Sequence, residues 1–399
     1  MYRFILETYR RLIEELSLTR TRYLYPSFHI RNRLTGLIGP RGVGKTTLLL
    51  QYIKNKLYQK GKSFYFTADH IYFQEATLLE FVSSLYQNEG YRIIFIDEIH
   101  KYQNWNQELK NLYDSFPSLK IVFSGSSMLD LVKGSYDLSR RAVLFHLRGL
   151  SFREYLNFVC DLDLKPIPFA TLLKKPQKIP NVPRILSHFQ DYLKHVYYPF
   201  VLEDVHSYYE KLTRVIDKTI FEDIANYYNL KTPNLQYFKK ILTYLASIPP
   251  GELVVHNLAQ NLAVDDKTAQ HYLSILASVG LVREIYPNGG GGVRIRKPSK
   301  IFLNNTTIMH TMQQYLEQPI PKGTERELFF IQSLQDAGVE LFYSNIGDFR
   351  TKNAVFEIGG KNKTGKQLKG AEKPSYLVKD DILTPLKGEI PLFRTGFLI

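Results

Sequence analysis

The sequence is poor in cysteine, with Cys160 alone among 399 residues. A single cysteine excludes an intramolecular disulfide and argues against a zinc cluster. No apolar run approaches the ~18 residues of a membrane-spanning helix, so we expect no membrane span. The opening MYRFILETYRRLIEE carries acidic residues and has no small-residue cleavage site, unlike a signal peptide. These absences together favour a cytoplasmic protein.

The charge is unbalanced toward the basic residues, with a formal net charge of +14 and a pI of about 9.4. One basic cluster lies in residues 281–300, and a second, in residues 350–373, has seven Lys or Arg against two acids. Such clusters favour polyanionic partners, of which double-stranded DNA is the one we expect. Many basic proteins bind no nucleic acid, so charge alone leaves this open.

The first 160 residues alternate short apolar segments with amphipathic ones. The apolar segments read as buried strands of a parallel sheet, at residues 33–38, 63–68, 92–96, 120–124 and 142–147. Amphipathic segments between them read as helices. Strand–helix alternation implies right-handed crossovers and predicts an α/β domain of three layers.

The remaining chain divides into three predicted parts. Residues 161–248 begin with five prolines between 165 and 184, which indicates an irregular connection, and continue as helices. Residues 249–305 read as a helix–turn–helix followed by a hairpin. Residues 306–399 return to a small α/β pattern.

The stretch GPRGVGKTTLLL has the spacing of a phosphate-binding loop. Its glycines let backbone N–H groups turn inward around phosphate oxygens, and the following helix adds its N-terminal dipole. Lys45 is expected to reach the β- and γ-phosphates, and the Thr46 hydroxyl is expected to hold Mg²⁺. The predicted nucleotide-binding residues are Gly39, Pro40, Arg41, Gly42, Val43, Gly44, Lys45, Thr46 and Thr47.

A second motif, RIIFIDEIH, ends a buried strand in Asp97 and Glu98. An acid at the carboxyl end of such a strand lies beside the phosphate loop, where Asp97 can hold Mg²⁺ through water. Glu98 is then placed to orient and deprotonate the attacking water. Alone, the pair could cap a helix; together with the phosphate loop it predicts ATP hydrolysis with ATP and Mg²⁺ as cofactors.

Two further segments offer catalytic side chains. Ser124 ends the fourth predicted strand, where it either senses the γ-phosphate or positions water, while Ser126 and Ser127 could instead cap a helix. Arg141, after Arg140, precedes the fifth strand. An arginine there can reach the nucleotide of a neighbouring subunit, which would make the active form a homo-oligomer; a solvated surface pair is the other interpretation.

These motifs, from GPRGVGKTTLLLQ through FIDEIHKYQNWNQELK and FSGSSMLDL to SRRAVLFHLRGLSFREYL, resemble a prokaryotic AAA+ ATPase family. The resemblance implies an AAA+ core, which we place at 1–160, a winged helix at 249–305 and a C-terminal domain similar to PD-(D/E)xK nucleases at 306–399. Residues 161–248 between them are expected to form a linker and helical lid region. It assigns the arginine before the fifth strand to Arg141, although Arg140 stands where the family has glycine.

The predicted winged helix contains a short helix with Leu258, Ala259 and Leu262 on its apolar face. A second helix runs from Lys267 to about Ser278, with Asp265 and Asp266 as N-caps and Gly280 as the end. If it enters a major groove, base edges meet the second helix and phosphates meet the wing. The predicted DNA-binding residues are Lys267, Thr268, Gln270, His271, Arg294, Arg296 and Lys297. The alternative is a lid or protein-binding module that never contacts DNA.

The resemblance to nucleases implies an acid on a helix, an Asp at a strand and a Glu followed by Lys, around Mg²⁺. The matching residues are Glu327 (Glu325 as a weaker choice), Asp348, Glu357 and Lys361. Position 359, where the lysine belongs, is glycine. Lys361 shares a strand face with 357 only if the strand continues past Gly359 and Gly360. We therefore expect a degenerate domain without cleavage.

The sequence thus predicts an ATPase acting on DNA or a DNA-bound complex. The alternatives are an oligomeric nucleotide-dependent switch that acts through a protein partner and an ATP-regulated nuclease. The sequence does not indicate the oligomer size, the DNA sequence preference or the pathway.

Overall fold

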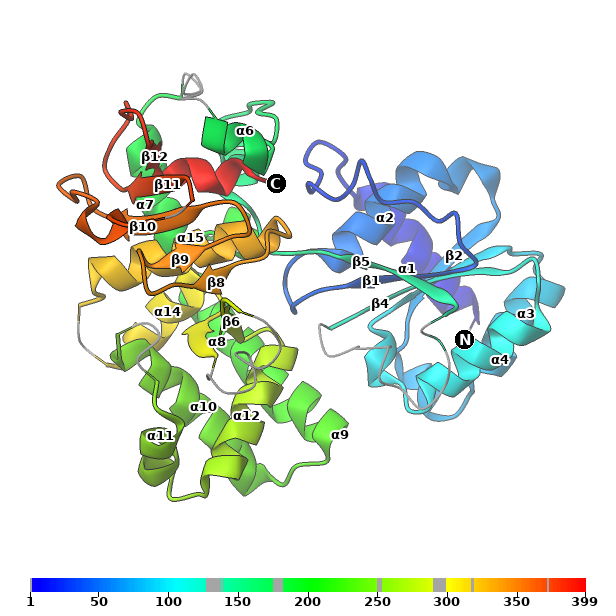
Figure 1. Ribbon diagram of the computed structural model, residues 1–399. Helices are drawn as coiled ribbons and strands as arrows, with labels where there is room; N and C mark the ends of the chain where they lie inside the picture. Colours follow the sequence, from blue (N-terminus) through cyan, green and yellow to red (C-terminus); the bar gives the residue numbers. More distant parts are fainter. Residues whose placement is uncertain are drawn as a thin grey trace. The chain divides into compact units, whose positions relative to one another are not determined.

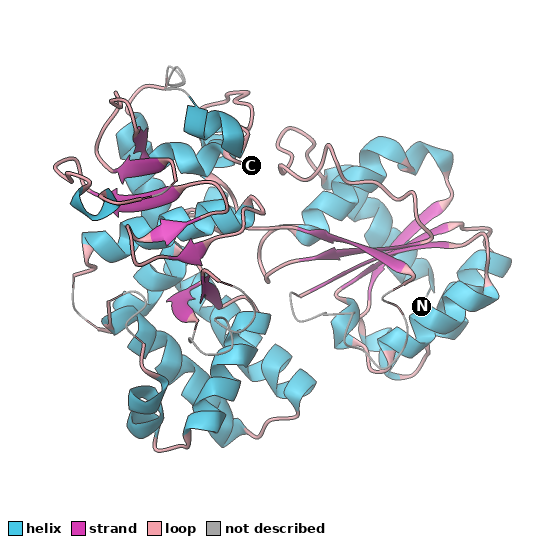
Figure 2. Cartoon of the chain, in the orientation of Figure 1, coloured by secondary structure: helices cyan, strands magenta, loops and turns pink. Residues whose placement is uncertain are grey.

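The computed structural model describes residues 2–126, 138, 140–174, 182–249, 253–289, 299–316, 319–371 and 373–399. The chain divides into two compact units, Met1–Arg148 and Gly149–Ile399. Each unit has its own sheet (Figures 1 and 2). No helix of the described ranges is long and apolar enough to cross a membrane.

The first unit is an α/β domain around a five-stranded sheet. Its elements are α1 (Tyr2–Glu15), β1 (Leu34–Ile38), α2 (Lys45–Lys56), η1 (Tyr58–Lys60), β2 (Ser63–Thr67), η2 (Ile71–Gln74), α3 (Leu78–Gln87), β3 (Ile93–Asp97), η3 (Ile99–Lys101), α4 (Trp105–Ser115), β4 (Lys120–Gly125) and β5 (Ala142–His146). All five predicted strands are therefore confirmed.

All neighbouring strands of this sheet are parallel, in the order β2-β3-β4-β1-β5. Helix α1 packs on α2, and α3 packs on α4. The connection from β1 to β2 through α2 runs across the sheet in the opposite direction to the connections through α3 and α4. Right-handed crossovers therefore put α2 on one face and α3 and α4 on the other. The interior strand β1, between β4 and β5, is buried along its whole length because both faces are covered. The parallel order brings the carboxyl ends of β1, β4 and β3 together at one edge.

The second unit begins with helices. They are α5 (Phe152–Val159), α6 (Phe169–Lys174), α7 (Ile185–His195), η4 (Pro199–Leu202), α8 (Tyr208–Lys218), the π-helix η5 (Thr219–Ile224), α9 (Ala225–Tyr228), α10 (Thr232–Ser247), α11 (Val255–Leu262) and α12 (Asp266–Ser278). The helices α11 and α12 match the predicted helix–turn–helix closely. The Asp265 carboxylate caps α12 by accepting the Thr268 N–H at 2.9 Å, and Gly280 ends the segment with a φ of 76°.

A mixed seven-stranded sheet completes the second unit. Its elements are β6 (Val282–Pro287), β7 (Lys300–Leu303), α14 (Thr306–Gln313), α15 (Lys322–Asp336), β8 (Phe342–Tyr343), β9 (Phe349–Arg350), β10 (Val355–Gly359), η6 (Lys366–Leu368), β11 (Ser375–Lys379), β12 (Glu389–Pro391) and η7 (Leu392–Phe397). The strand order is β12-β11-β10-β9-β8-β6-β7. The β6–β7 hairpin therefore shares one sheet with the C-terminal strands, because β6 pairs with β8.

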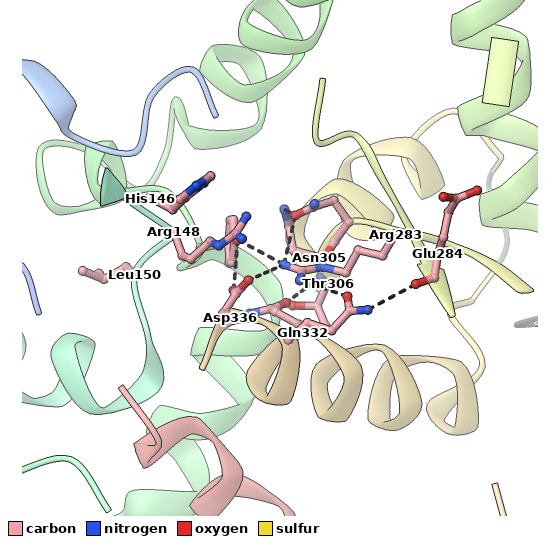
Figure 3. A network of polar contacts seen from close by, with 12 residues as sticks. His146, Arg148, Leu150, Arg283, Glu284, Asn305, Thr306, Gln332 and Asp336 are labelled. Atoms are coloured by element: carbon pink, nitrogen blue, oxygen red, sulfur yellow. Dashed lines mark hydrogen bonds and ion pairs between the residues drawn. The ribbon is translucent and has the colours of Figure 1, made fainter. Parts of the chain in front are cut away.

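A buried ion pair joins the same two regions across the predicted boundary at 305 (Figure 3). Arg283 of β6 donates to the Asp336 carboxylate of α15 at 2.8 Å, and the Tyr197 hydroxyl donates to the other carboxylate oxygen at 3.0 Å. The Arg283 guanidinium also donates to the Gln335 side chain at 3.3 Å. The hairpin and the C-terminal strands thus have a common core.

Candidate nucleotide site

The phosphate-loop sequence lies between the end of β1 and the start of α2. Gly44 is the N-cap of α2 with a φ of 92°, a conformation that glycine adopts without strain. A Cβ on Gly39 would come 2.2 Å from the Leu147 carbonyl oxygen, so a larger residue does not fit there. The two glycines are required for different reasons, a backbone conformation and a close approach.

Within this loop Lys45 is buried, with 4% of its surface exposed. Its ammonium donates to the carbonyl oxygens of Gly39 at 3.0 Å and Pro40 at 3.1 Å. The positive charge is therefore held inside the loop. Among the other predicted loop residues, Val43 is buried and Thr47 is exposed.

Next to the loop, the Asp97 carboxylate is the centre of a hydroxyl cluster. Its Oδ2 accepts the Thr46 hydroxyl at 2.6 Å and the Tyr65 hydroxyl at 2.8 Å. Its Oδ1 accepts the Ser124 hydroxyl. Strand β4 lies between β1 and β3, so Ser124 reaches Asp97 from the adjacent strand. Three predicted site residues, Thr46, Asp97 and Ser124, are thus in direct contact.

Tyr65, the fourth member of this cluster, was not predicted from the sequence. It lies on β2 and is 5% exposed. Burial, reinforced by the negative charge of Asp97, raises the pKa of Tyr65, so its hydroxyl stays protonated and donates. In the sequence Tyr65 is one aromatic residue in the apolar stretch SFYFT, where nothing distinguishes it from a core residue.

Glu98 follows Asp97 in a left-handed backbone conformation with a φ of 50°. A non-glycine residue in that region is strained by about 1 kcal/mol or more, and such strain is concentrated at functional sites. The Glu98 N–H donates to the Ser124 hydroxyl at 3.2 Å. The Glu98 carboxylate lies 3.4 Å from His100 Nε2 and keeps 25% of its side-chain surface exposed. It is thus the more accessible of the two acids.

Arg22 is a second residue that the sequence did not reveal. Its guanidinium donates to the Val43 carbonyl in the phosphate loop and, at 2.8 Å, to the Arg148 carbonyl after β5. The side chain is 6% exposed. Arg22 therefore fastens the loop to the segment that follows the fifth strand, through backbone carbonyls that no sequence pattern specifies.

Arg141 lies at the amino end of β5, where Ala142 pairs with Leu34 at the start of β1. The phosphate loop follows the other end of β1, about 16 Å away at ~3.3 Å per residue. The Arg141 guanidinium donates to the Asp114 carboxylate at 3.3 Å and lies over the Tyr113 ring. Arg141 cannot reach the phosphate loop of its own chain from that position.

The described residues that were predicted to contact DNA are on α12. Lys267, Gln270 and His271 are exposed, and Thr268 donates its hydroxyl to Asp265 at 2.7 Å as part of the N-cap. The buried face of α12 consists of apolar residues together with Tyr272. Arg294, Arg296 and Lys297, and also Ser127, lie outside the described residues.

The predicted nuclease acids Glu327, Asp348 and Glu357 influence one another electrostatically in the second unit. Burial, and then the charge of Asp348, raises the pKa of Glu327 to about 7. Burial also raises the pKa of Asp348, which accepts the Ile358 N–H at 2.7 Å. Glu325, the weaker choice, instead contacts His310 and Lys322, each at 2.7 Å.

The lysine of this cluster is a different one from the residue predicted. Strand β10 ends at Gly359, so Lys361 does not share a strand face with Glu357 and is exposed. Lys363 instead places its Nζ 3.2 Å from Glu357 Oε1. Its side chain passes 2.6 Å from where a Cβ of residue 359 would lie. Within the described ranges, no three His, Cys, Asp or Glu side chains are grouped to hold a metal ion.

Comparisons with known proteins bear on both units. Residues 31–156 match an AAA domain, and residues 186–318 match a domain of unknown function, DUF8612. The uncharacterized protein MJ1637 of Methanocaldococcus jannaschii is 29% identical over 308 residues, which is 71% of this chain and 63% of the relative. A second protein of that organism, MJ1544, is 22% identical over 63% of this chain and 56% of the relative. The chain thus spans less than two thirds of either relative.

Among solved structures, AMPPCP-bound DnaA from Aquifex aeolicus is 18% identical, with a TM-score of 0.26 over 68% of this chain and 86% of that chain. The nucleotide-binding assignment rests instead on the AAA domain match, which includes the phosphate loop, Asp97 and Ser124. The parallel five-stranded sheet fits such a core. Residues 31–156 are therefore similar to an AAA domain, and this similarity supports nucleotide binding by the phosphate loop.

Proposed function

We propose that this chain binds ATP with Mg²⁺ and hydrolyses it in the first unit. The observation that supports this most directly is the contact of Thr46 and Ser124 with Asp97 beside the phosphate loop. A chance glycine-rich turn would not bring three polar side chains from α2, β3 and β4 together at the end of β1.

The donor set fits a magnesium ion. The Thr46 hydroxyl and the Asp97 carboxylate, 2.6 Å apart, offer the hard oxygen ligands that Mg²⁺ prefers. Thr46 would hold the ion directly and Asp97 through water. When bound, the ion would supply positive charge that offsets the negative charge developing on the phosphate during hydrolysis.

Lys45 and Glu98 have the two remaining roles. The Lys45 ammonium would exchange the carbonyl oxygens of Gly39 and Pro40 for the phosphate oxygens of ATP, a charge-assisted contact. Glu98 would accept a proton from the attacking water, since its side chain is the more exposed acid at this edge. Its backbone N–H, bonded to Ser124, ties its position to β4.

The test compares wild type with Glu98→Gln, and with Glu75→Gln as the control because Glu75 is exposed outside the site. Loss of steady-state hydrolysis in Glu98→Gln with retained ATP binding supports the proposal. Full turnover in Glu98→Gln would contradict the assignment of Glu98 as the base.

Arg141 would complete the site of a neighbouring copy, and the active form would be a homo-oligomer. Its position at the far edge of the sheet supports a role in trans. Arg141→Ala and Lys45→Ala subunits should each be inactive, whereas a mixture should recover part of the activity at mixed interfaces. No recovery on mixing, or an active Arg141→Ala variant, would refute this role.

We also propose that the second unit brings this ATPase to DNA. The exposed residues Lys267, Gln270 and His271 on α12, and the net charge of +14, support it. Each lost phosphate contact should reduce the slope of log affinity against log salt by about 0.9. The triple variant Arg294→Ala/Arg296→Ala/Lys297→Ala should therefore flatten the slope by about 2 to 3. An unchanged slope would contradict phosphate contact by the wing.

A further inference from the structure

The strand β2 contributes Tyr65 to the nucleotide site, although the phosphate loop and Asp97 lie on other elements. The Tyr65 hydroxyl donates to Asp97 Oδ2 at 2.8 Å, and the Thr46 hydroxyl donates to the same oxygen at 2.6 Å. The other oxygen, Oδ1, accepts the Ser124 hydroxyl and the Glu98 N–H. The carboxylate therefore has two donors on each oxygen, and Tyr65 is one of them.

The Tyr65 side chain that makes this contact is buried and packed. Tyr65 is 5% exposed, and β2 pairs with β3 in a register that sets Tyr65 opposite Phe95 and Thr67 opposite Asp97. From the other side Tyr9 of α1 packs against the Tyr65 ring, with 6.3 Å between ring centroids. The phenol can therefore neither rotate into solvent nor be replaced by water without a change in packing.

We infer that Tyr65 is a positioning residue for the metal site, which orients the Asp97 carboxylate toward the Mg²⁺ that Thr46 would hold. This inference rests on the proposed function. Without Tyr65 the Oδ2 oxygen keeps Thr46 as its remaining side-chain donor, and Thr46 is the residue whose oxygen would bind the ion. Tyr65 thus holds the carboxylate in place by a contact independent of the metal ligand.

Outer-shell partners of metal ligands typically change metal affinity or activity by 10–100-fold when removed. Tyr65→Phe keeps the ring and its packing and removes the hydroxyl. We therefore expect it to raise the half-saturating Mg²⁺ concentration about tenfold or more. ATP affinity in EDTA, where Lys45 and the loop bind the phosphates, should be within twofold of wild type.

The matched control is Tyr9→Phe. The Tyr9 hydroxyl donates to the Ser63 carbonyl oxygen at 3.3 Å and does not contact Asp97. Like Tyr65, Tyr9 is buried, with 4% of its surface exposed. Tyr9→Phe therefore removes a buried phenol hydroxyl from the same packed region, as Tyr65→Phe does. A general loosening of β2 would alter both variants equally.

The experiment measures the dissociation constant of a fluorescent non-hydrolysable ATP analogue across a Mg²⁺ titration and in EDTA. Wild type and Tyr9→Phe should bind more tightly as Mg²⁺ rises, with a common midpoint, while the Tyr65→Phe midpoint shifts upward. A Tyr65→Phe midpoint equal to that of wild type, or an equal shift in Tyr9→Phe, would overturn the role of Tyr65 alone. A wild type that binds no nucleotide, or binds it independently of Mg²⁺, would refute the proposed function as well.

Discussion

The ion pair between Arg283 and Asp336 should be among the most sensitive points of the second unit. Both side chains are buried, with 7% and 5% exposed, and they lie 2.8 Å apart. Asp336→Ala would leave the guanidinium buried without its carboxylate and remove an acceptor of the Tyr197 hydroxyl. Removing one partner of a buried pair costs about 3–5 kcal/mol. The equilibrium constant for local opening of this region should therefore rise by a factor of roughly 10² to 10⁴.

Hydrogen exchange followed by mass spectrometry can measure this locally, in peptides from β6 and α15. Replacing both partners, in Arg283→Met/Asp336→Leu, should destabilise less than Asp336→Ala because no unpaired charge stays buried. Glu210→Ala, which breaks an exposed pair with Arg214 at 72% and 65% exposure, should cost no more than about 0.5 kcal/mol. An Asp336→Ala effect as small as that of Glu210→Ala would refute the reasoning.

Three further predictions concern single residues. Lys45→Ala should abolish ATP binding in a calorimetric titration, since it removes a charge-assisted phosphate contact; retained tight binding would contradict the loop assignment. Gly39→Ala should destabilise the fold by about 1–3 kcal/mol, because the added Cβ would lie 2.2 Å from the Leu147 carbonyl oxygen. Its melting temperature should therefore fall, whereas that of the control Gly323→Ala should not, since there is open space around Gly323. Burial raises the pKa of Glu327 from 4.5 to about 7, so the folded state binds a proton more tightly than the unfolded state and stability should fall as pH rises through that window. Glu327→Gln should flatten this fall in denaturant midpoints measured between pH 4.5 and 7, and an unaltered pH profile would show that Glu327 is not the group involved.

Local patterns in the sequence were sufficient to predict the strands of the first unit and the residues of its two motifs. Apolar runs predicted its five strands, and the loop spacing placed Lys45 and Thr46 at the start of a helix. Asp97 was predictable because an acid that ends a buried strand must lie at the carboxyl edge of a parallel sheet. Tyr65 could not be predicted, since its role depends on β2 lying beside β3. From the sequence alone, a tyrosine in an apolar strand cannot be distinguished from a core residue.

In the second unit, contacts between distant residues could not be predicted from hydrophobic periodicity. The helices α11 and α12 were predicted from their apolar faces and caps, but the pairing of β6 with β8 joins residues more than fifty positions apart. Lys361 was predicted to face the same side as Glu357 because side chains alternate along a strand. The strand β10 ends at Gly359, so this alternation does not extend to Lys361. Lys363 reaches Glu357 because the chain turns back after the strand, a geometry that spacing along the sequence does not indicate.

The measurement that tests the central claim most directly is steady-state ATP hydrolysis by wild type and Glu98→Gln, with and without duplex DNA at low salt. We predict turnover that rises with DNA and is lost in Glu98→Gln. Turnover that requires Glu98 but ignores DNA would contradict the DNA role and favour a nucleotide-dependent switch with a protein partner. Absence of wild-type hydrolysis under every condition would contradict the ATPase itself.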